Sequence, residues 1–379
     1  MRLAILLALG ISAACAPATL DAQGEAHPRQ RGATPPAGAH SVDATSVVVH
    51  GLYVNRWAAQ SKARMRSLIR FAHETGINAM VIDLKDEFGL NFQPADSGAR
   101  RFAGRAGVIP DVRWLIDTLR ANGVMPIARL VVFKDSVTAR ARPDWTILGQ
   151  DGKSWRDKQG LTWVNPYHHE LWEYNIRVAT EAATLGFAEI QFDYIRFPEP
   201  YPTLPKQTFP DANGASKSDA LAAFLREARS RLTPLGVRTT ADVFGLVTTV
   251  KGALEVGQQW ESLSPAADVL LPMVYPSHYV HGSFGIALPD AAPYEVVKAA
   301  ISRAVERNAA LGIKGEHVRP YLQAFTLGKP AYGNAELTAQ IRATYESGIN
   351  GWILWNPGSR YDVFRGALTE DAARRAGTR

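Results

Sequence analysis

The segment EIQFDYIRFPEP, residues 189–200, places an aspartate and an arginine in a run of apolar and aromatic residues. Burying an unpaired charge is costly, so Asp193 and Arg196 are expected where this strand leaves the core. The part through Phe192 is expected to pack on both faces. Two further carboxylates lie in apolar runs, Asp83 in AMVIDL and Asp242 in RTTADVFG. Paired carboxyl groups can supply acid–base or nucleophilic chemistry, as at the anomeric carbon of a sugar.

Polar and aromatic side chains also occur toward the ends of the apolar runs. A sugar site combines carboxyl groups with aromatic faces against which the C–H surfaces of a pyranose ring pack. The residues expected to bind the substrate are Arg129, Tyr194, Arg196, Tyr275, His278, Gln323, Trp355 and Asn356.

The carboxylates also have structural interpretations. Asp193 could form an ion pair with Arg196 or Arg129, and Asp83 could pair with Lys85 or Arg129. Both interpretations stay open, because ion-pair networks also occupy the ends of strands.

Metal and cofactor chemistry is not indicated. The sequence has no G-x-S-x-G elbow, P-loop or H-E-x-x-H motif,. His278 and His281 have i,i+3 spacing but no carboxylate in helical register with them,. We therefore expect no metal and no cofactor. Asp242 also has a structural interpretation, in which it caps the helix that follows it and takes no part in catalysis.

The chain has 379 residues, of which 46% are hydrophobic and 21% charged, which is ordinary globular composition,. The net charge is +6, but the arginines are dispersed, so we expect no nucleic-acid partner,. The expected partner is a polysaccharide or oligosaccharide, and the expected state is a monomer.

The N-terminal residues have the layout of a secretory signal, with one positive charge before an apolar run and then small residues,. Cys15 follows Ser-Ala-Ala, which resembles a lipobox with Ser12 where leucine is usual. Lipidation of Cys15 and ordinary cleavage nearby both stay open. We expect a signal peptide over residues 1–22, a flexible linker over 23–46 and an exported protein, periplasmic or extracellular, whose membrane contact is at most a lipid anchor.

Eight short β-branched runs alternate with amphipathic stretches from residue 47 onward. The runs cover residues 47–54, 79–84, 124–133, 188–197, 238–245, 268–275, 318–325 and 351–356. This rhythm predicts an α/β fold, a (β/α)8 TIM barrel forming a single catalytic domain over residues 47–365, with a C-terminal tail over 366–379. An open doubly wound sheet competes, but no glycine-rich phosphate turn follows the first run.

Two connections are longer than the others, at residues 134–166 and 198–216. Both follow strands, so they should lie at the C-terminal face, where barrel enzymes hold their active sites. We expect them to shape a substrate cleft.

The segments FAEIQFDYIRFP, ADVFGL, LLPMVYPSHY, RPYLQAFTLG and GWILWNPGSRYD resemble, in this order, a bacterial glycoside hydrolase family that was formerly a domain of unknown function. The resemblance spans about residues 47–362. It implies a TIM barrel distantly similar to alpha-amylase-like enzymes, in several of which an aspartate ending the fourth strand is the nucleophile. Asp193 matches that place. Those enzymes have a glutamate as acid at the end of the fifth strand, where this chain has Asp242.

The leading hypothesis is an exported glycoside hydrolase that acts on a polysaccharide. Asp193 would be the nucleophile or base and Asp242 the general acid, with Asp83 in reserve for either role. Arg129 and Arg196 would keep Asp193 ionised. The alternative is a carbohydrate-binding pseudoenzyme, and a metal-dependent deacetylase is a third, weaker hypothesis.

Overall fold

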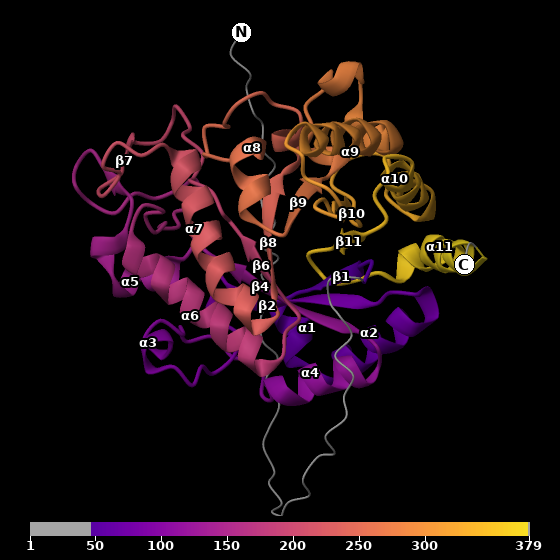
Figure 1. The fold of residues 1–379 in the computed structure, drawn as a ribbon, viewed down its shortest axis with the longest axis horizontal. Helices are drawn as coiled ribbons and strands as arrows, with labels where there is room; N and C mark the ends of the chain where they lie inside the picture. Colours follow the sequence, from indigo (N-terminus) through magenta and orange to yellow (C-terminus); the bar gives the residue numbers. More distant parts are fainter. Residues whose placement is uncertain (1–46, 378–379) are drawn as a thin grey trace, which may run out of the picture.

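The computed structural model describes residues 47–377. Eight parallel strands form a closed barrel, in the order β1-β11-β10-β9-β8-β6-β4-β2, with β1 also pairing with β2 (Figure 1). The strands are β1 (His50–Val54), β2 (Ala79–Asp86), β4 (Met125–Val131), β6 (Glu189–Asp193), β8 (Arg238–Phe244), β9 (Val269–Val274), β10 (Tyr321–Gln323) and β11 (Trp352–Trp355). The predicted (β/α)8 barrel is confirmed.

Helices surround the barrel and cover the outer faces of its strands (Figure 1). They are α1 (Arg56–Gln60), α2 (Lys62–Thr75), α3 (Ser97–Arg100), α4 (Val112–Ala121), α5 (Ser136–Ala141), α6 (His169–Leu185), α7 (Lys217–Leu232), α8 (Trp260–Leu263), α9 (Pro293–Ala310), α10 (Asn334–Glu346) and α11 (Arg365–Gly377). Gly76 and Gly186 end α2 and α6 with φ values of 65° and 112°. This left-handed conformation suits glycine, and at the end of each helix it turns the chain directly toward the next strand.

The apolar core has two parts. The larger part lies between the strands and the helices, and the smaller part lies inside the barrel. The buried members of the inner cluster are Val49, Tyr53, Ala79, Val81, Ile127, Val269, Leu271, Tyr275, Tyr321 and Ile353. Alternate positions of each strand therefore point inward, as the pleat of a strand requires.

The two long connections are joined to each other. β5 (Leu148–Gly149) lies in the first and pairs antiparallel with β7 (Gln207–Thr208) in the second. The indole of Trp155 donates to the carbonyl oxygen of Pro205 at 2.8 Å, and the amide of Asn165 donates to that of Pro210 at 2.5 Å. These contacts make one continuous covering beyond the C-terminal ends of β4 and β6.

The segment expected as a C-terminal tail differs from the prediction. Residues Arg365–Gly377 form α11, which packs against α2 and α10 and buries Ala367, Leu368 and Asp371. This helix covers the outer face of the barrel beside β1, so the folded unit extends beyond residue 365 (Figure 1).

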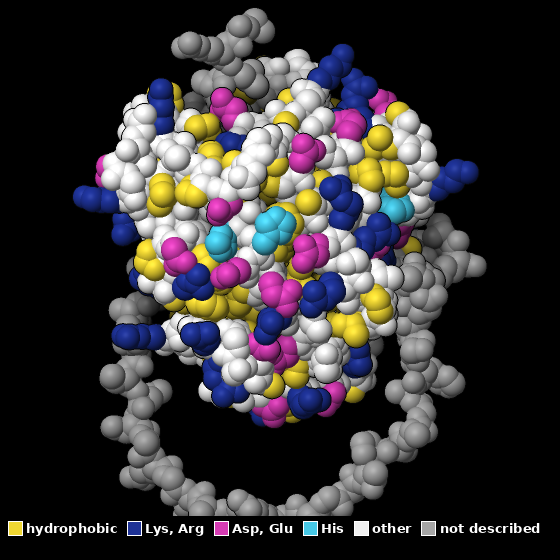
Figure 2. All heavy atoms as spheres, turned by 60° about the vertical axis from the view of Figure 1, so that its left-hand side comes forward, with side chains coloured by type: hydrophobic (Ala, Val, Ile, Leu, Met, Phe, Trp, Pro, Cys, Tyr) yellow, Lys and Arg dark blue, Asp and Glu magenta, His cyan; other side chains and the backbone are white. Residues whose placement is uncertain are grey.

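The expected signal peptide, Cys15 and the linker over residues 23–46 lie outside the described residues. Within residues 47–377, none of the helices combines the length and the apolar character needed to cross a bilayer. Figure 2 shows one face of the molecule, on which acidic and basic side chains are intermixed.

Candidate active site

The strand β6 alternates between polar inward and apolar outward side chains. Glu189, Gln191 and Asp193 are buried inside the barrel, whereas Ile190 and Phe192 belong to the cluster facing the helices. The expectation that this strand packs on both faces is confirmed, since all five of its residues are buried, but its inward face is polar rather than apolar. The inward residues form a polar column that ends at the C-terminal rim in Asp193.

Each level of this column has polar partners from other strands. At the lower level, Glu189 receives hydrogen bonds of 2.7 and 3.1 Å from Arg319. At the middle level, the Gln191 amide donates to Asp242 Oδ2 at 2.9 Å and to the Tyr321 hydroxyl at 2.7 Å. The interior of the barrel therefore combines the inner apolar cluster with a column of polar residues from β6.

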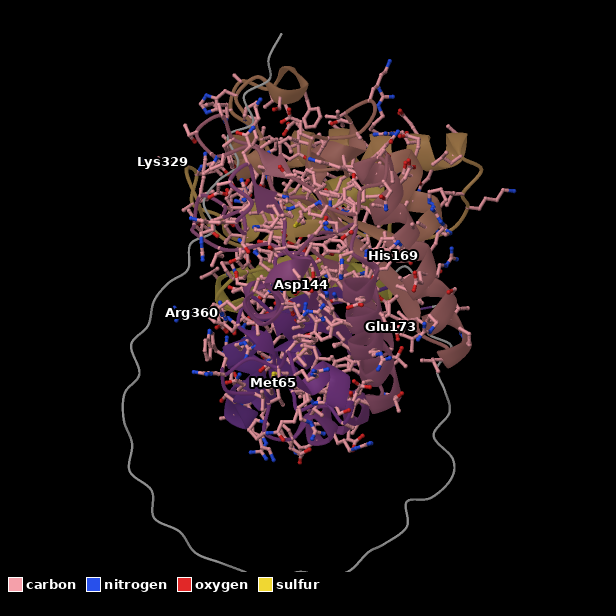
Figure 3. The ribbon with its side chains drawn as sticks, turned by 90° about the vertical axis from the view of Figure 1, so that its left-hand side faces the viewer. Met65, Asp144, His169, Glu173, Lys329 and Arg360 are labelled. Atoms are coloured by element: carbon pink, nitrogen blue, oxygen red, sulfur yellow. The ribbon has the colours of Figure 1, made fainter. Side chains whose placement is uncertain are left out.

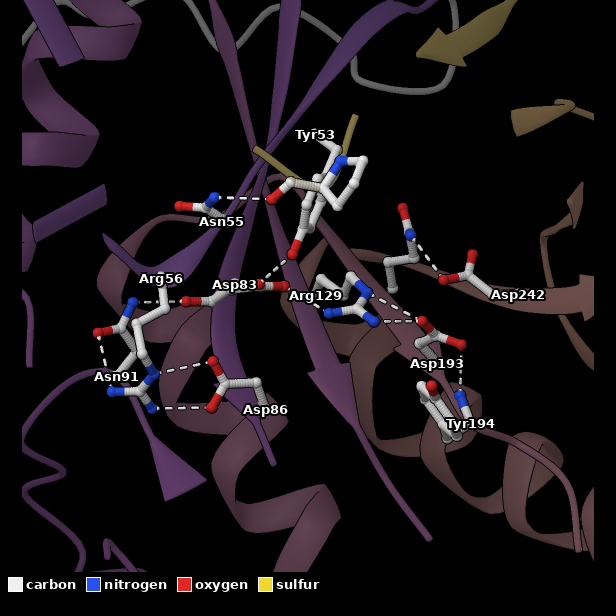
Figure 4. Close-up of polar contacts among 12 residues, drawn as sticks. Tyr53, Asn55, Arg56, Asp83, Asp86, Asn91, Arg129, Asp193, Tyr194 and Asp242 are labelled. Carbon is white, nitrogen blue, oxygen red and sulfur yellow. Dashed lines mark hydrogen bonds and ion pairs between the residues drawn. The ribbon is translucent and has the colours of Figure 1, made fainter. Parts of the chain in front are cut away.

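At the upper level, Arg129 of β4 bridges two carboxylates (Figure 4). Its Nε and Nη2 donate to Asp193 Oδ2 at 2.9 and 2.5 Å, and its Nη1 donates to Asp83 Oδ1 at 2.5 Å. The other oxygen of Asp83 accepts a hydrogen bond from the Tyr53 hydroxyl. Asp83 therefore uses both of its oxygens within the protein.

The environment of Asp83 favours its neutral form. Burial raises the pKa of Asp83 to about 7, although the charge of Arg129 acts in the opposite direction,. A carboxyl group with such a pKa titrates near neutral pH.

Aromatic rings lie beside this ion-pair cluster. Trp355 stacks on Tyr53 with ring centroids 3.8 Å apart, and the Arg129 guanidinium lies 5.2 Å from the Trp355 ring centroid. Trp355 is partly exposed, as expected of a side chain toward the end of its apolar run. Its neighbour Trp352 points outward and is fully buried against the helices.

Asp242 of β8 is bound by an amide, whereas Asp193 is bound by a cation. The Oδ2 of Asp242 accepts from Gln191, and among the described residues its Oδ1 has no hydrogen-bonding partner. Burial raises the pKa of Asp242 well above its usual value, and the charge of the nearby Asp193 carboxylate raises it further. Burial and the neighbouring Asp193 carboxylate therefore both favour the protonated form of Asp242,.

Three buried polar atoms of the described chain lack a partner in this region, namely Asp242 Oδ1, Gln191 Oε1 and the Tyr275 hydroxyl oxygen. Buried polar atoms are satisfied in most proteins, so a group of orphans calls for an explanation. Hydrogen-bonding capacity directed at a bound molecule provides one. The role of Tyr275 in binding the substrate stays a prediction.

The backbone after Asp193 is strained. Tyr194 has φ of 53°, which is uncommon for a bulky residue,. In this conformation its N–H donates to Asp193 Oδ1 at 2.5 Å. Its ring lies near two cations, 5.1 Å from Lys134 Nζ and 4.9 Å from the Arg196 guanidinium carbon. The strain serves to orient Asp193, as strained residues at functional sites often do.

The expectation that Arg196 keeps Asp193 ionised is wrong. Arg196 Nη1 lies 3.1 Å from Glu199 Oε2, and its guanidinium packs over the rings of Trp163 and Phe244. This cation therefore stabilises the loop after β6 rather than the carboxylate at the end of the strand.

Lys85, the cation considered as a partner of Asp83, faces outward instead. It pairs with Asp135 at 2.7 Å. Two residues apart on a regular strand, Asp83 and Lys85 would point to the same face. The register of β2 shifts between them, so Lys85 points to the opposite face. Of the two cations considered for Asp83, Arg129 is thus the one that binds it.

Two more of the predicted substrate-binding residues have structural partners instead. Gln323 Oε1 accepts hydrogen bonds from the backbone N–H and the hydroxyl of Ser277, and Asn356 Nδ2 donates to the backbone carbonyl oxygen of Ala324 at 2.6 Å. Both side chains hold loops beside the site. The ring of His278 lies 5.3 Å from that of Tyr275, and burial lowers the pKa of His278 to about 4.

Tyr53, Gln191 and Tyr321 belong to the site but were not predicted. The period-two spacing of polar residues in EIQFD was a signal for Gln191, since a strand brings residues two apart to one face. The tyrosines resemble ordinary core residues in the sequence. Within residues 47–377, no group of three or more His, Cys, Asp or Glu side chains is arranged to hold a metal ion.

The loops after the strands place charged residues along one edge of the molecule. Lys329 and Arg360, which follow β10 and β11, lie there, whereas His169 and Glu173 of α6 lie toward the opposite edge (Figure 3). Lys329 and Arg360 come after strands in the chain, so they lie beyond the C-terminal ends of β10 and β11.

Residues 51–361 match a family model described as "Putative glycosyl hydrolase domain". Among curated proteins, none is similar enough to this chain to count as a match.

Several solved structures share the fold. The glycoside hydrolase domain of PgaB (BpsB) from Bordetella bronchiseptica is 15% identical, with a TM-score of 0.58 over 85% of this chain and 99% of that one. The alpha-L-fucosidase isoenzyme 2 from Paenibacillus thiaminolyticus is 13% identical, with a TM-score of 0.57 over 87% and 50%. The noncanonic maltogenic alpha-amylase AmyB from Thermotoga neapolitana is 11% identical, with a TM-score of 0.51 over 88% and 77%. At these identities the similarity concerns the fold.

Proposed function

This chain belongs to the family of glycosyl hydrolase domains that its residues 51–361 match, and from that premise we propose that it is an exported enzyme that cleaves glycosidic bonds in a polysaccharide. One observation supports this most directly. Asp242 has a strongly raised pKa, whereas its neighbour Asp193 is paired with Arg129. Two carboxyl groups whose environments hold them in different protonation states supply an acid and a base or nucleophile.

In the proposed reaction, Asp242 protonates the oxygen of the scissile glycosidic bond as the bond to the anomeric carbon breaks. Asp193 attacks the anomeric carbon and forms a glycosyl ester. Asp242, now ionised, takes a proton from water, and the resulting hydroxide displaces Asp193 to release the sugar. Retaining enzymes have carboxyl groups ~5 Å apart and inverting enzymes ~6.5–9.5 Å. The reaction written here is the retaining one, which requires the shorter separation.

Asp83 has a different role in this proposal. It binds the same guanidinium as Asp193, so in this proposal it is a positioning residue that fixes Arg129 against Asp193. Tyr275, with its unpartnered hydroxyl, and Trp355, with its partly exposed ring, are the predicted substrate-binding residues best placed to contact a sugar.

Export is supported by the N-terminal sequence alone, with its positive charge, apolar run and small residues,. A polymeric substrate outside the cytoplasm agrees with such a signal. Fusing residues 1–46 to a reporter enzyme tests export, and a fusion that stays in the cytoplasm contradicts it. Replacing Cys15 by Ser in the same fusion tests lipid anchoring.

The catalytic assignment is tested with Asp193→Asn and Asp242→Asn. Both variants and the wild type are assayed for release of reducing ends from starch, xylan, chitosan and peptidoglycan. Each variant should lose about 100-fold or more of the wild-type turnover. Asp144→Asn is the matched control, since Asp144 is exposed and pairs with Arg142 at the surface. Near-wild-type turnover in Asp193→Asn would show that the assignment is wrong.

One observation favours the binding pseudoenzyme as a second candidate. Asp83, Asp193 and Asp242 are only 3%, 5% and 1% exposed, so the carboxyl groups are almost covered. Under this alternative the wild type binds one of the four polymers and releases no reducing ends from any of them.

A further inference from the structure

Two aromatic side chains at the C-terminal rim are largely open to solvent. Trp57 is 59% exposed and Phe88 is 45% exposed. Their ring centroids are 5.9 Å apart and their planes are tilted by 56°. Trp57 lies at the start of α1, directly after β1, and Phe88 lies in the turn between β2 and β3 (Gly89–Leu90). Both therefore lie beyond the C-terminal ends of neighbouring strands.

The backbone that carries these rings is fixed by a buried ion pair (Figure 4). Arg56, next to Trp57, donates to both oxygens of Asp86 at 2.8 and 2.9 Å. Asp86 Oδ1 also accepts the backbone N–H of Phe88 at 2.9 Å. Arg56 further donates to the carbonyl oxygen of Gly89 at 2.7 Å. A single network thus holds both aromatic residues, and binding to them requires little ordering of the backbone.

The same two strands lead into the candidate active site. Tyr53, four residues before Trp57, faces the interior of the barrel from β1. Asp83 lies on β2 five residues before Phe88, and the hydrogen bond from the Tyr53 hydroxyl to Asp83 joins the two strands at the rim. The exposed rings are therefore carried by the same two strands that bring Tyr53 and Asp83 to the rim.

The exposed area decides between kinds of partner. A large aromatic side chain contributes about 150–250 Å² when it is fully buried on binding. At the observed exposures, the two rings offer on the order of 200 Å², against about 800 Å² per partner in a standard protein interface. The faces of one or two pyranose rings match that smaller area.

We propose that Trp57 and Phe88 form a binding platform for pyranose rings of the polysaccharide, outside the site of cleavage. This inference rests on the proposed function for the identity of the polymer. The two aromatic rings stack against the C–H faces of sugar units that extend over the rim from Asp83. The platform adds affinity for a long chain and takes no part in breaking the bond.

The experiment is affinity electrophoresis of the full chain in gels that contain soluble starch, xylan or glycol chitin. The Asp242→Asn background is used so that the polymer stays intact. Trp57→Ala should weaken retention roughly 10-fold, and Trp57→Phe should restore part of it, because a smaller ring still stacks. Leu235→Ala is the matched control, since Leu235 is 46% exposed but precedes β8 at the opposite end of the barrel.

The outcomes separate this proposal from the proposed function. If Trp57→Ala is retained as strongly as Leu235→Ala, or if no polymer retains the Asp242→Asn parent, the platform is refuted whatever the hydrolysis assays show. If retention depends on Trp57 but the wild type hydrolyses none of the polymers, the platform stands and the hydrolase proposal fails. Melting temperatures equal to that of the parent exclude unfolding as the cause of lost retention.

Discussion

Asp83 should make the stability of the protein depend on pH, and Asp83→Asn should remove that dependence. Burial raises the pKa of this carboxyl group from 3.8 to about 7. The folded state therefore binds the proton more tightly than the unfolded state does. The stability that this proton confers is complete below about pH 4 and is lost as the pH rises to about 7.

The size of the effect follows from the shift. A difference of about three pKa units corresponds to roughly 4 kcal/mol of unfolding free energy between pH 4 and pH 8,. The amide introduced by Asp83→Asn carries no titrating proton, so the variant lacks this contribution to the pH dependence. At pH 4 the variant should be about 1–3 kcal/mol less stable than the wild type, since it disturbs buried hydrogen bonds. At pH 8 the variant should be the more stable of the two. By then the wild type has lost roughly 4 kcal/mol of unfolding free energy, which exceeds the cost of the substitution.

The assay is urea unfolding followed by tryptophan fluorescence at pH 4, 5.5, 7 and 8. The quantity of interest is the difference in unfolding free energy between Asp83→Asn and the wild type, because other titrating groups largely cancel in it. Asp144→Asn, which changes an exposed carboxylate, should give a difference that is nearly constant with pH. A constant difference for Asp83→Asn as well would refute the reasoning about burial.

Four further predictions concern the same cluster. In the same unfolding series, Tyr53→Phe should lose stability at a higher pH than the wild type does, because the hydrogen bond from the Tyr53 hydroxyl lowers the pKa of Asp83. Arg129→Met should lower the unfolding free energy at pH 7 by about 3–5 kcal/mol, because it leaves buried carboxylates unpaired; a loss below about 1 kcal/mol would contradict this. Tyr194→Gly should be about 1 kcal/mol more stable than Tyr194→Ala in urea, since φ of 53° strains alanine,. In pH–rate profiles, activity should fall as the pH rises through the raised pKa of Asp242, because the general acid loses its proton,.

The order of the elements could be predicted because it depends on local patterns. Apolar runs of strand length, amphipathic stretches and glycines after helices are all readable along the chain. Each predicted run overlaps one barrel strand, although β2 extends two residues beyond its run, to Asp86. Parallel strands bring their C-terminal ends to one face, so Asp193 and Asp83 could be expected to lie together. The structure brings them within reach of one guanidinium, that of Arg129.

The partners of the charged residues could not be predicted in the same way. Arg196 is three residues from both Asp193 and Glu199, and only the path of the chain after Tyr194 directs it to Glu199. Asp242 depends on Gln191, which comes from another strand 51 positions away. Such pairings follow from how the strands of a closed barrel face one another, which a single sequence does not specify.

The position of β1 between β2 and β11 has a consequence for how the protein is made. His50 Nε2 lies 3.1 Å from the carbonyl oxygen of Asn350, which is 300 positions away along the chain. Ribosomes add about 5–20 residues per second, so β1 is complete about 15–60 s before β11 exists. During that interval one edge of the growing sheet is unpaired and open to misassembly, and only synthesis of the final strand can close the barrel.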